Sequence, residues 1–91
     1  MQNCNNLYKI HIETLGCRLN QIESESIAKS FSDVGFSISM ESVTAKNVIQ
    51  NEVIMSVLNT CTVTQKSEQK ARRIIRLMLE KYPQAVILVT G

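Results

Sequence analysis

The chain has 91 residues, 44% of them hydrophobic and 20% charged, which suits one small domain with a buried core. Its three cysteines are too few for a disulfide scaffold, and no apolar run approaches the ~18–20 residues of a membrane-spanning helix. The first residues are polar and lack the apolar segment of a signal peptide, so we expect a cytoplasmic protein with reduced thiols and no membrane contact.

The first part of the chain predicts a strand, a helix and a second strand. Residues 9–14 alternate isoleucine with polar side chains, as a half-buried strand does. Asn20, followed three residues later by Glu23, resembles an N-cap pair. A helix is therefore expected over residues 20–34. After the next glycine, residues 36–40 alternate apolar side chains with serine and predict the second strand.

The second part of the chain predicts a strand, a longer helix and a last strand. Residues 53–58 are almost continuously apolar, as expected for a strand covered on both faces. Residues 62–65 resemble a capping box and open a helix that extends to about Tyr82, where the following proline stops it. Residues 85–89 read as a last buried strand, whereas residues 41–52 show no clear pattern.

This alternation of strands and helices predicts an α/β fold, a parallel sheet flanked by helices in a flavodoxin-like three-layer arrangement. In such sheets ligands gather at the carboxyl ends of the strands. Cys17 follows the first predicted strand and Cys61 follows the third. We therefore expect both thiols at one edge of the sheet, where Gly91 also ends the last strand.

Five interpretations of Cys17 and Cys61 can be compared from the sequence. Both can be reduced structural cysteines, although their neighbours are polar. A phosphatase loop needs an arginine six positions after the cysteine, and those positions hold Glu23 and Ser67. Zinc prefers four Cys or His ligands, and the lone His11 reads as an ordinary strand residue. A redox pair has no signature here. An iron–sulfur cluster suits thiolates from separate loops, but needs more than two.

The remaining cysteine and the basic residues have simpler interpretations. Cys4 lies in a polar terminus and reads as an incidental thiol. Residues 66–91 carry six basic and two acidic side chains, whereas the rest of the chain is slightly acidic. A solvated helix face explains this asymmetry, and contact with RNA is the alternative. The basic residues are Lys66, Lys70, Arg72, Arg73, Arg76 and Lys81.

Three segments together resemble the N-terminal domain of the radical-SAM methylthiotransferases. They are TLGCRLNQIESE (14–25), NTCTVTQKSEQKARRIIR (59–76) and AVILVTG (85–91). The resemblance implies that Cys17 and Cys61 are two of three cysteine ligands of an auxiliary 4Fe–4S cluster, with the third expected just after Gly91. It also implies that residues 1–91 are a fragment, inactive alone. S-adenosylmethionine, a second 4Fe–4S cluster and an RNA-binding domain would then belong to other parts of the protein.

The sequence around the second cysteine distinguishes branches of that family. NTCTVT, with the basic run after it, most resembles the branch that adds a methylthio group to C2 of N6-threonylcarbamoyladenosine at position 37 of tRNA. The isopentenyladenosine branch typically reads NTCSIR, and the ribosomal-protein branch has proline where this chain has Arg18. The resemblance thus implies tRNA and the radical-SAM domain of the same protein as partners.

Residues near the two thiols would have secondary roles by this resemblance. Asn20, Asn59 and Thr60 flank the cysteines and would hydrogen-bond the cluster, or simply stabilise a cap and a turn. Three arginines of the second helix would face tRNA or the neighbouring domain: Arg72, Arg73 and Arg76. The alternatives are a small α/β RNA- or protein-binding module with incidental thiols, or a methylthiotransferase of another branch.

Overall fold

Strands and helices alternate in the computed structural model, which describes residues 8–61 and 65–90. All paired strands are parallel, in the order β2-β1-β3-β4. This is the order found in flavodoxin-like sheets, so the predicted α/β fold with a parallel sheet is confirmed. In chain order the elements are β1 (Lys9–Leu15), α1 (Arg18–Asp33), β2 (Ser37–Ser39), β3 (Val53–Thr60), α2 (Gln65–Lys81) and β4 (Val86–Thr90).

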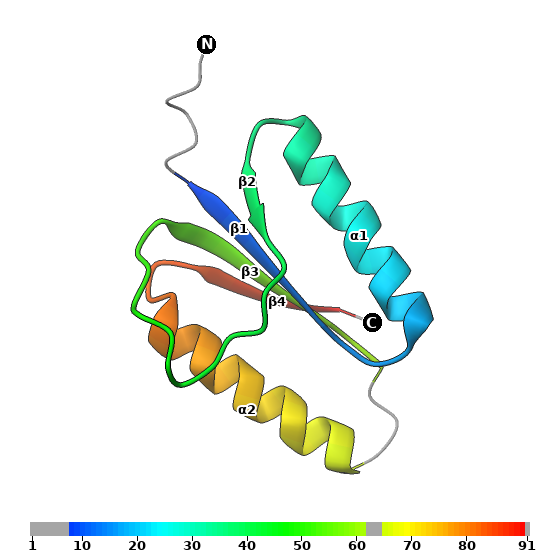
Figure 1. The fold of residues 1–91 in the computed structure, drawn as a ribbon. Helices are drawn as coiled ribbons and strands as arrows, with labels where there is room; N and C mark the ends of the chain where they lie inside the picture. The colour runs from blue at the N-terminus through cyan, green and yellow to red at the C-terminus, as the bar shows by residue number, and fades with distance from the viewer. Residues whose placement is uncertain (1–7, 62–64, 91) are drawn as a thin grey trace.

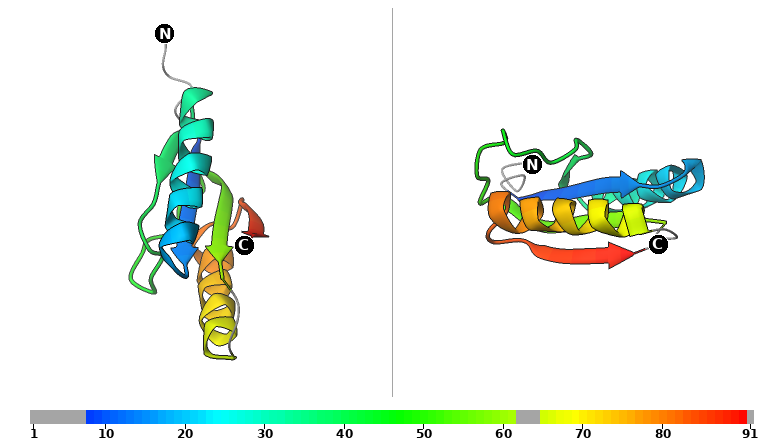
Figure 2. Two further views of the ribbon diagram at one scale, coloured as in Figure 1. Left: turned by 90° about the vertical axis from the view of Figure 1, so that its right-hand side faces the viewer. Right: turned by 90° about the horizontal axis from the view of Figure 1, so that it is seen from below.

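The two helices lie on opposite faces of the sheet (Figures 1 and 2). The chain leaves β1 through α1 to reach β2 on one side, and leaves β3 through α2 to reach β4 on the other. Because both crossovers between parallel strands are expected to be right-handed, opposite directions of travel place the helices on opposite faces. The direction of travel changes between β1 and β3, which is where flavodoxin-like sheets bind their ligands.

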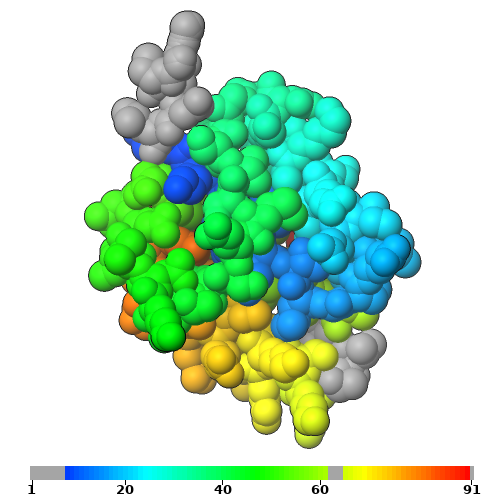
Figure 3. All heavy atoms as spheres, viewed as in Figure 1, coloured from blue at the N-terminus to red at the C-terminus, as the bar shows by residue number. Residues whose placement is uncertain are grey.

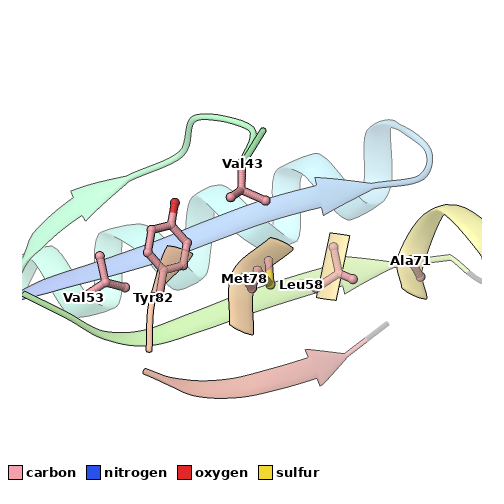
Figure 4. Close-up of a cluster of buried hydrophobic side chains, with 6 residues drawn as sticks. All are labelled: Val43, Val53, Leu58, Ala71, Met78 and Tyr82. Carbon is pink, nitrogen blue, oxygen red and sulfur yellow. The ribbon is translucent and has the colours of Figure 1, made fainter. Parts of the chain in front are cut away.

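Alternation along the central strands builds one core on each face. Ile10 and Ile12 of β1 and Val57 of β3 pack against Ala28 of α1. On the other face Leu58 of β3 packs against the α2 side in a cluster that the close-up in Figure 4 shows. The members of this second cluster are Val43, Val53, Leu58, Ala71, Met78 and Tyr82.

Segment 40–52 completes the core on the α2 face without forming a helix or a strand. It crosses the surface between the two helices (Figure 3). Val43 inserts into the α2 cluster and is 4% exposed. The Val43 amide donates to Glu13 Oε1 at 2.9 Å, and the Glu41 carbonyl accepts from His11 Nε2 at 2.8 Å. The segment without a sequence pattern is thus fixed by contacts to β1.

Two expectations from the sequence are wrong. Asn20 does not cap α1: the helix begins at Arg18 with Cys17 as its N-cap, because the chain turns at Gly16 directly after β1. The last strand is not buried: Val86 and Leu88 of β4 are 65% and 49% exposed, because β4 is an edge strand. The expected capping box falls mostly on residues 62–64, outside the described residues. Neither α1 nor α2 is long and apolar enough to cross a membrane.

Candidate metal centre

Cys17 and Cys61 lie at the same edge of the sheet, as the strand pattern predicts. Leu15, the last residue of β1, pairs with Thr60, the last residue of β3. The Cys61 amide continues this ladder by donating to the Leu15 carbonyl at 3.0 Å. Gly91 is outside the described residues, but Thr90 pairs with Asn59, so β4 ends at this edge as well.

Gly16 lets the two cysteine-bearing loops approach each other. Its φ of +153° is one that L side chains rarely adopt. A Cβ atom placed on Gly16 would lie 2.5 Å from Asn20 Oδ1 and 3.1 Å from Cys61 Cβ. Glycine at this position therefore brings the loop after β1 close to the side chain of Cys61.

The Cys17 thiol is exposed and sits at the N-terminus of α1. Hydrogen bonds from the backbone amides of Asn20 and Leu19 lower the pKa of this thiol below its ordinary value. The helix dipole acts in the same direction, because it favours negative charge at an N-terminus. Both effects favour the thiolate form of Cys17 relative to an ordinary cysteine. The Cys61 thiol is half-buried.

A buried pair of asparagines ties α1 to the end of β3 below the thiols. Asn20 Oδ1 accepts from the Cys17 amide at 3.2 Å, while Asn20 Nδ2 donates to Asn59 Oδ1 at 3.1 Å. Asn59 Nδ2 donates in turn to the Asn20 carbonyl at 2.8 Å and to Ser24 Oγ at 3.2 Å. Both amides are thus used within the protein, and Asn20 acts as the N3 residue that bonds the backbone of the Cys17 cap, rather than as the cap itself.

The pairing of Asn20 with Asn59 is a feature that sequence reasoning missed. The sequence of β3 contains a clue to it. Asn59 lies two residues after Val57 and four after Met55, so it shares their apolar face towards α1. A polar side chain at such a position needs a buried partner. Asn59 is 1% exposed and finds that partner in α1.

Of the other candidate residues, Thr60 directly precedes Cys61 at the end of β3, whereas the arginines lie along α2. Thr60 is buried. Arg72 lies on α2 and pairs with Glu68 at 2.8 Å. Arg73 and Arg76 are exposed on the same helix. His11 is fully buried and hydrogen-bonded through both ring nitrogens, which supports its interpretation as a strand residue. Cys4 is outside the described residues.

Two thiols alone do not make a metal centre. Across residues 8–61 and 65–90, no three Cys, His, Asp or Glu side chains are grouped so as to hold a metal ion. At the same edge of the sheet, a hollow of about 430 Å³ opens between α1 and the end of β4, next to Asn59. Its lining includes Glu23, Asn59 and Thr90. The edge therefore offers two thiols and space for a further ligand.

Residues 9–91 match the model of a family described as Uncharacterized protein family UPF0004. The chain is 52% identical over 93% of its length to the threonylcarbamoyladenosine tRNA methylthiotransferase MtaB of Treponema pallidum, and 33% identical over 90% to that of Bacillus subtilis. It is also 34% identical over 96% to the tRNA-2-methylthio-N(6)-dimethylallyladenosine synthase of Neorickettsia sennetsu.

These relatives are much longer than the chain. It spans 17% of the Treponema and Neorickettsia proteins and 16% of the Bacillus protein. No solved structure matches the chain significantly.

Proposed function

This chain belongs to the family described as Uncharacterized protein family UPF0004, and from that premise we propose that it is the N-terminal domain of a tRNA methylthiotransferase acting on N6-threonylcarbamoyladenosine. The observation that carries the proposal is the meeting of Cys17 and Cys61 at the carboxyl edge of β1 and β3. The identity of 52% to the Treponema enzyme favours this substrate over dimethylallyladenosine, because the Neorickettsia enzyme that is named for dimethylallyladenosine is only 34% identical.

The two cysteines at this edge of the sheet fit the role of two ligands of an iron–sulfur cluster. Cys17 is exposed with a lowered pKa, and Gly16 leaves room for Cys61 beside it. Cluster iron binds thiolates from separate loops, and the third thiolate would follow Gly91. A 4Fe–4S cluster held there, with one iron free of cysteine, would supply the sulfur for C2 of adenine. The protein's own part is to hold two thiolates, through Gly16 and the Asn20–Asn59 pair.

We further propose that residues 1–91 are one domain of a longer protein. The relatives are about six times longer. In addition, β4 is an edge strand among the described residues, so its backbone is suited to pair with a further strand, and the face that exposes Val86 and Leu88 is suited to cover by a further helix. A radical-SAM domain, which uses S-adenosylmethionine and its own cluster, and an RNA-binding domain would follow.

Reconstitution with iron and sulfide tests the ligands. The 91-residue chain and a version extended past Gly91 are treated under anaerobic conditions, and cluster absorbance is followed near ~400 nm. We expect a cluster in the extended protein, its loss in Cys17→Ala and Cys61→Ala, and no change in Cys4→Ala, the matched control. A cluster that survives both substitutions would show that these thiols are not ligands.

Nucleoside analysis of tRNA tests the substrate. A strain lacking the gene is expected to lose 2-methylthio-N6-threonylcarbamoyladenosine and to keep 2-methylthio-dimethylallyladenosine. Loss of the second nucleoside instead would assign the protein to the other branch. If neither nucleoside changes, the chain acts on a different substrate, such as a protein, or is a binding module with incidental thiols.

A further inference from the structure

A second hollow, on the α2 face of the sheet, has a buried carboxylate in its wall. It measures about 230 Å³ and lies between β1, segment 40–52 and α2. Half of its lining residues are apolar. The charged ones are Lys70 and Arg73 of α2 and Glu13 of β1. This volume is below the roughly 300–1,000 Å³ of pockets that enclose drug-sized ligands. It suits a group the size of one nucleobase.

One oxygen of Glu13 is without a partner in the described part of the chain. Glu13 is only 6% exposed. Its Oε1 accepts from the Val43 amide and lies 3.4 Å from His11 Nε2, whereas no described residue donates to Oε2. Every fully buried side-chain oxygen or nitrogen in the described residues has a partner, so Oε2 is not fully buried, and Glu13 is one of the residues that line the hollow. A carboxylate oxygen that is accessible from such a hollow can accept a hydrogen bond from water or from a ligand.

A stripe of positive charge runs along α2 beside this hollow. Lys66, Lys70 and Arg73 follow each other at spacings of four and three residues, so they share one side of the helix. All three are exposed, and none forms an ion pair with the residues that the structure describes. Arg72, on a different side, is paired with Glu68. The three cations are therefore available to bind successive anionic groups of an extended polymer.

We propose that this surface binds single-stranded RNA, with phosphates on Lys66, Lys70 and Arg73 and one base in the hollow. The base donates an exocyclic amino group to Glu13 Oε2, as cytosine N4 does to carboxylates in base recognition. Apolar walls cover the base faces, while the cations at the rim meet its phosphate. This inference deepens the proposed function, because it takes the tRNA substrate as the source of the RNA.

Salt dependence tests the phosphate contacts. Binding of a short labelled oligocytidylate to the 91-residue chain is measured by fluorescence anisotropy at several salt concentrations. Replacing Lys66, Lys70 and Arg73 together by glutamine should flatten the slope of log K against log salt by about 2, since each single-strand phosphate contact contributes roughly 0.7. Lys29→Gln, an exposed lysine on α1, is the control and should leave the slope within about 0.3. Equal slopes for the triple variant and the unmodified chain would refute the proposed phosphate contacts of these three side chains.

Base choice tests the hollow independently. Oligocytidylate and oligouridylate of one length have the same charge, but uracil presents an acceptor where cytosine presents a donor. The unmodified chain should bind the cytosine strand at least about 10-fold more tightly, the effect of one hydrogen bond to a charged group. Glu13→Gln keeps an oxygen for the Val43 amide and offers an amide donor to uracil, so it should abolish or reverse the preference. Equal binding of the two strands by the unmodified chain would refute the role of Glu13 without any variant.

The outcomes are separable from those of the proposed function. Circular dichroism and the urea midpoint confirm that each variant is folded. Cys17→Ala should leave RNA binding unchanged, and the triple variant should still assemble a cluster in the extended protein. RNA binding without a cluster would therefore defeat the proposed function alone, and a cluster without RNA binding would defeat this inference alone.

Discussion

Replacing Asn59 by alanine tests how the two cysteine-bearing loops are held together. The change removes three contacts at 3.2 Å or less, to Asn20 Nδ2, to the Asn20 carbonyl and to Ser24 Oγ. Ser24 keeps its bond with Thr14, but Asn20 Nδ2 is left buried without a partner. A buried unpaired donor and the lost hydrogen bonds together cost about 3 kcal/mol of unfolding free energy. That is a large share of the roughly 5–14 kcal/mol expected for a domain of this length.

Urea unfolding followed by circular dichroism measures this loss. With a slope of about 1 kcal/mol per molar urea, the midpoint should fall by about 3 M. Asn51→Ala is the matched control, because Asn51 is exposed in a turn and no hydrogen bond of its side chain occurs in the described residues. It should change the unfolding free energy by less than about 0.5 kcal/mol.

A double-mutant cycle decides whether the cause is the pairing itself. Asn20→Ala should also destabilise the chain, but the double variant should be about 1–2 kcal/mol more stable than the sum of the single effects predicts, because neither partner is then left unpaired. Strict additivity of the two substitutions would refute the reasoning, even if each one alone is destabilising.

Three further predictions concern the same edge and the neighbouring core. Gly16→Ala should lower the unfolding free energy by about 2–4 kcal/mol in urea, because the new methyl group meets Asn20 and Cys61 at a strained φ; an unchanged midpoint would contradict the close approach. Cys17, isolated by replacing the other cysteines with alanine, should be alkylated with a lower pH midpoint in the folded chain than in urea, because its folded pKa is lowered; the stabilising contribution of its thiolate is present above the unfolded pKa and disappears as pH falls through the folded one. A midpoint at or above the unfolded value would reverse that sign. Val43→Ala should cost about 2 kcal/mol in urea unfolding, and a loss below about 0.5 kcal/mol would show that segment 40–52 does not belong to the core.

Much of the architecture follows from local patterns. Alternation over β1 and the apolar run of β3 predict central strands, and two crossovers then predict helices on both faces. The same logic predicts that Cys17 and Cys61 meet at one edge. Two expectations failed because a local sequence pattern does not show which distant segments will pack against it. The apolar run of β4 reads as buried, yet the strand lies at an edge and exposes Val86 and Leu88.

The start of α1 shows the same limit on a smaller scale. Asn20 and Glu23 have the spacing of a cap, and the sequence therefore favours a start at Asn20. In the structure Asn20 instead turns its amide towards Cys17 and Asn59, and the helix begins two residues earlier. The partner that decides this, Asn59, is far away in the chain and becomes a neighbour only when β1 pairs with β3.

The sequence by itself determined the elements, the parallel sheet and the placement of two cysteines at its carboxyl edge, because strand periodicity and crossover handedness are set by short stretches of chain. Only the tertiary structure decided what those residues contact. Three features depend on side chains from distant segments that meet in a closely packed interior. They are the Asn20–Asn59 pair, the environment of the Glu13 carboxylate, and the packing of segment 40–52 over the α2 face. No local pattern contains that information.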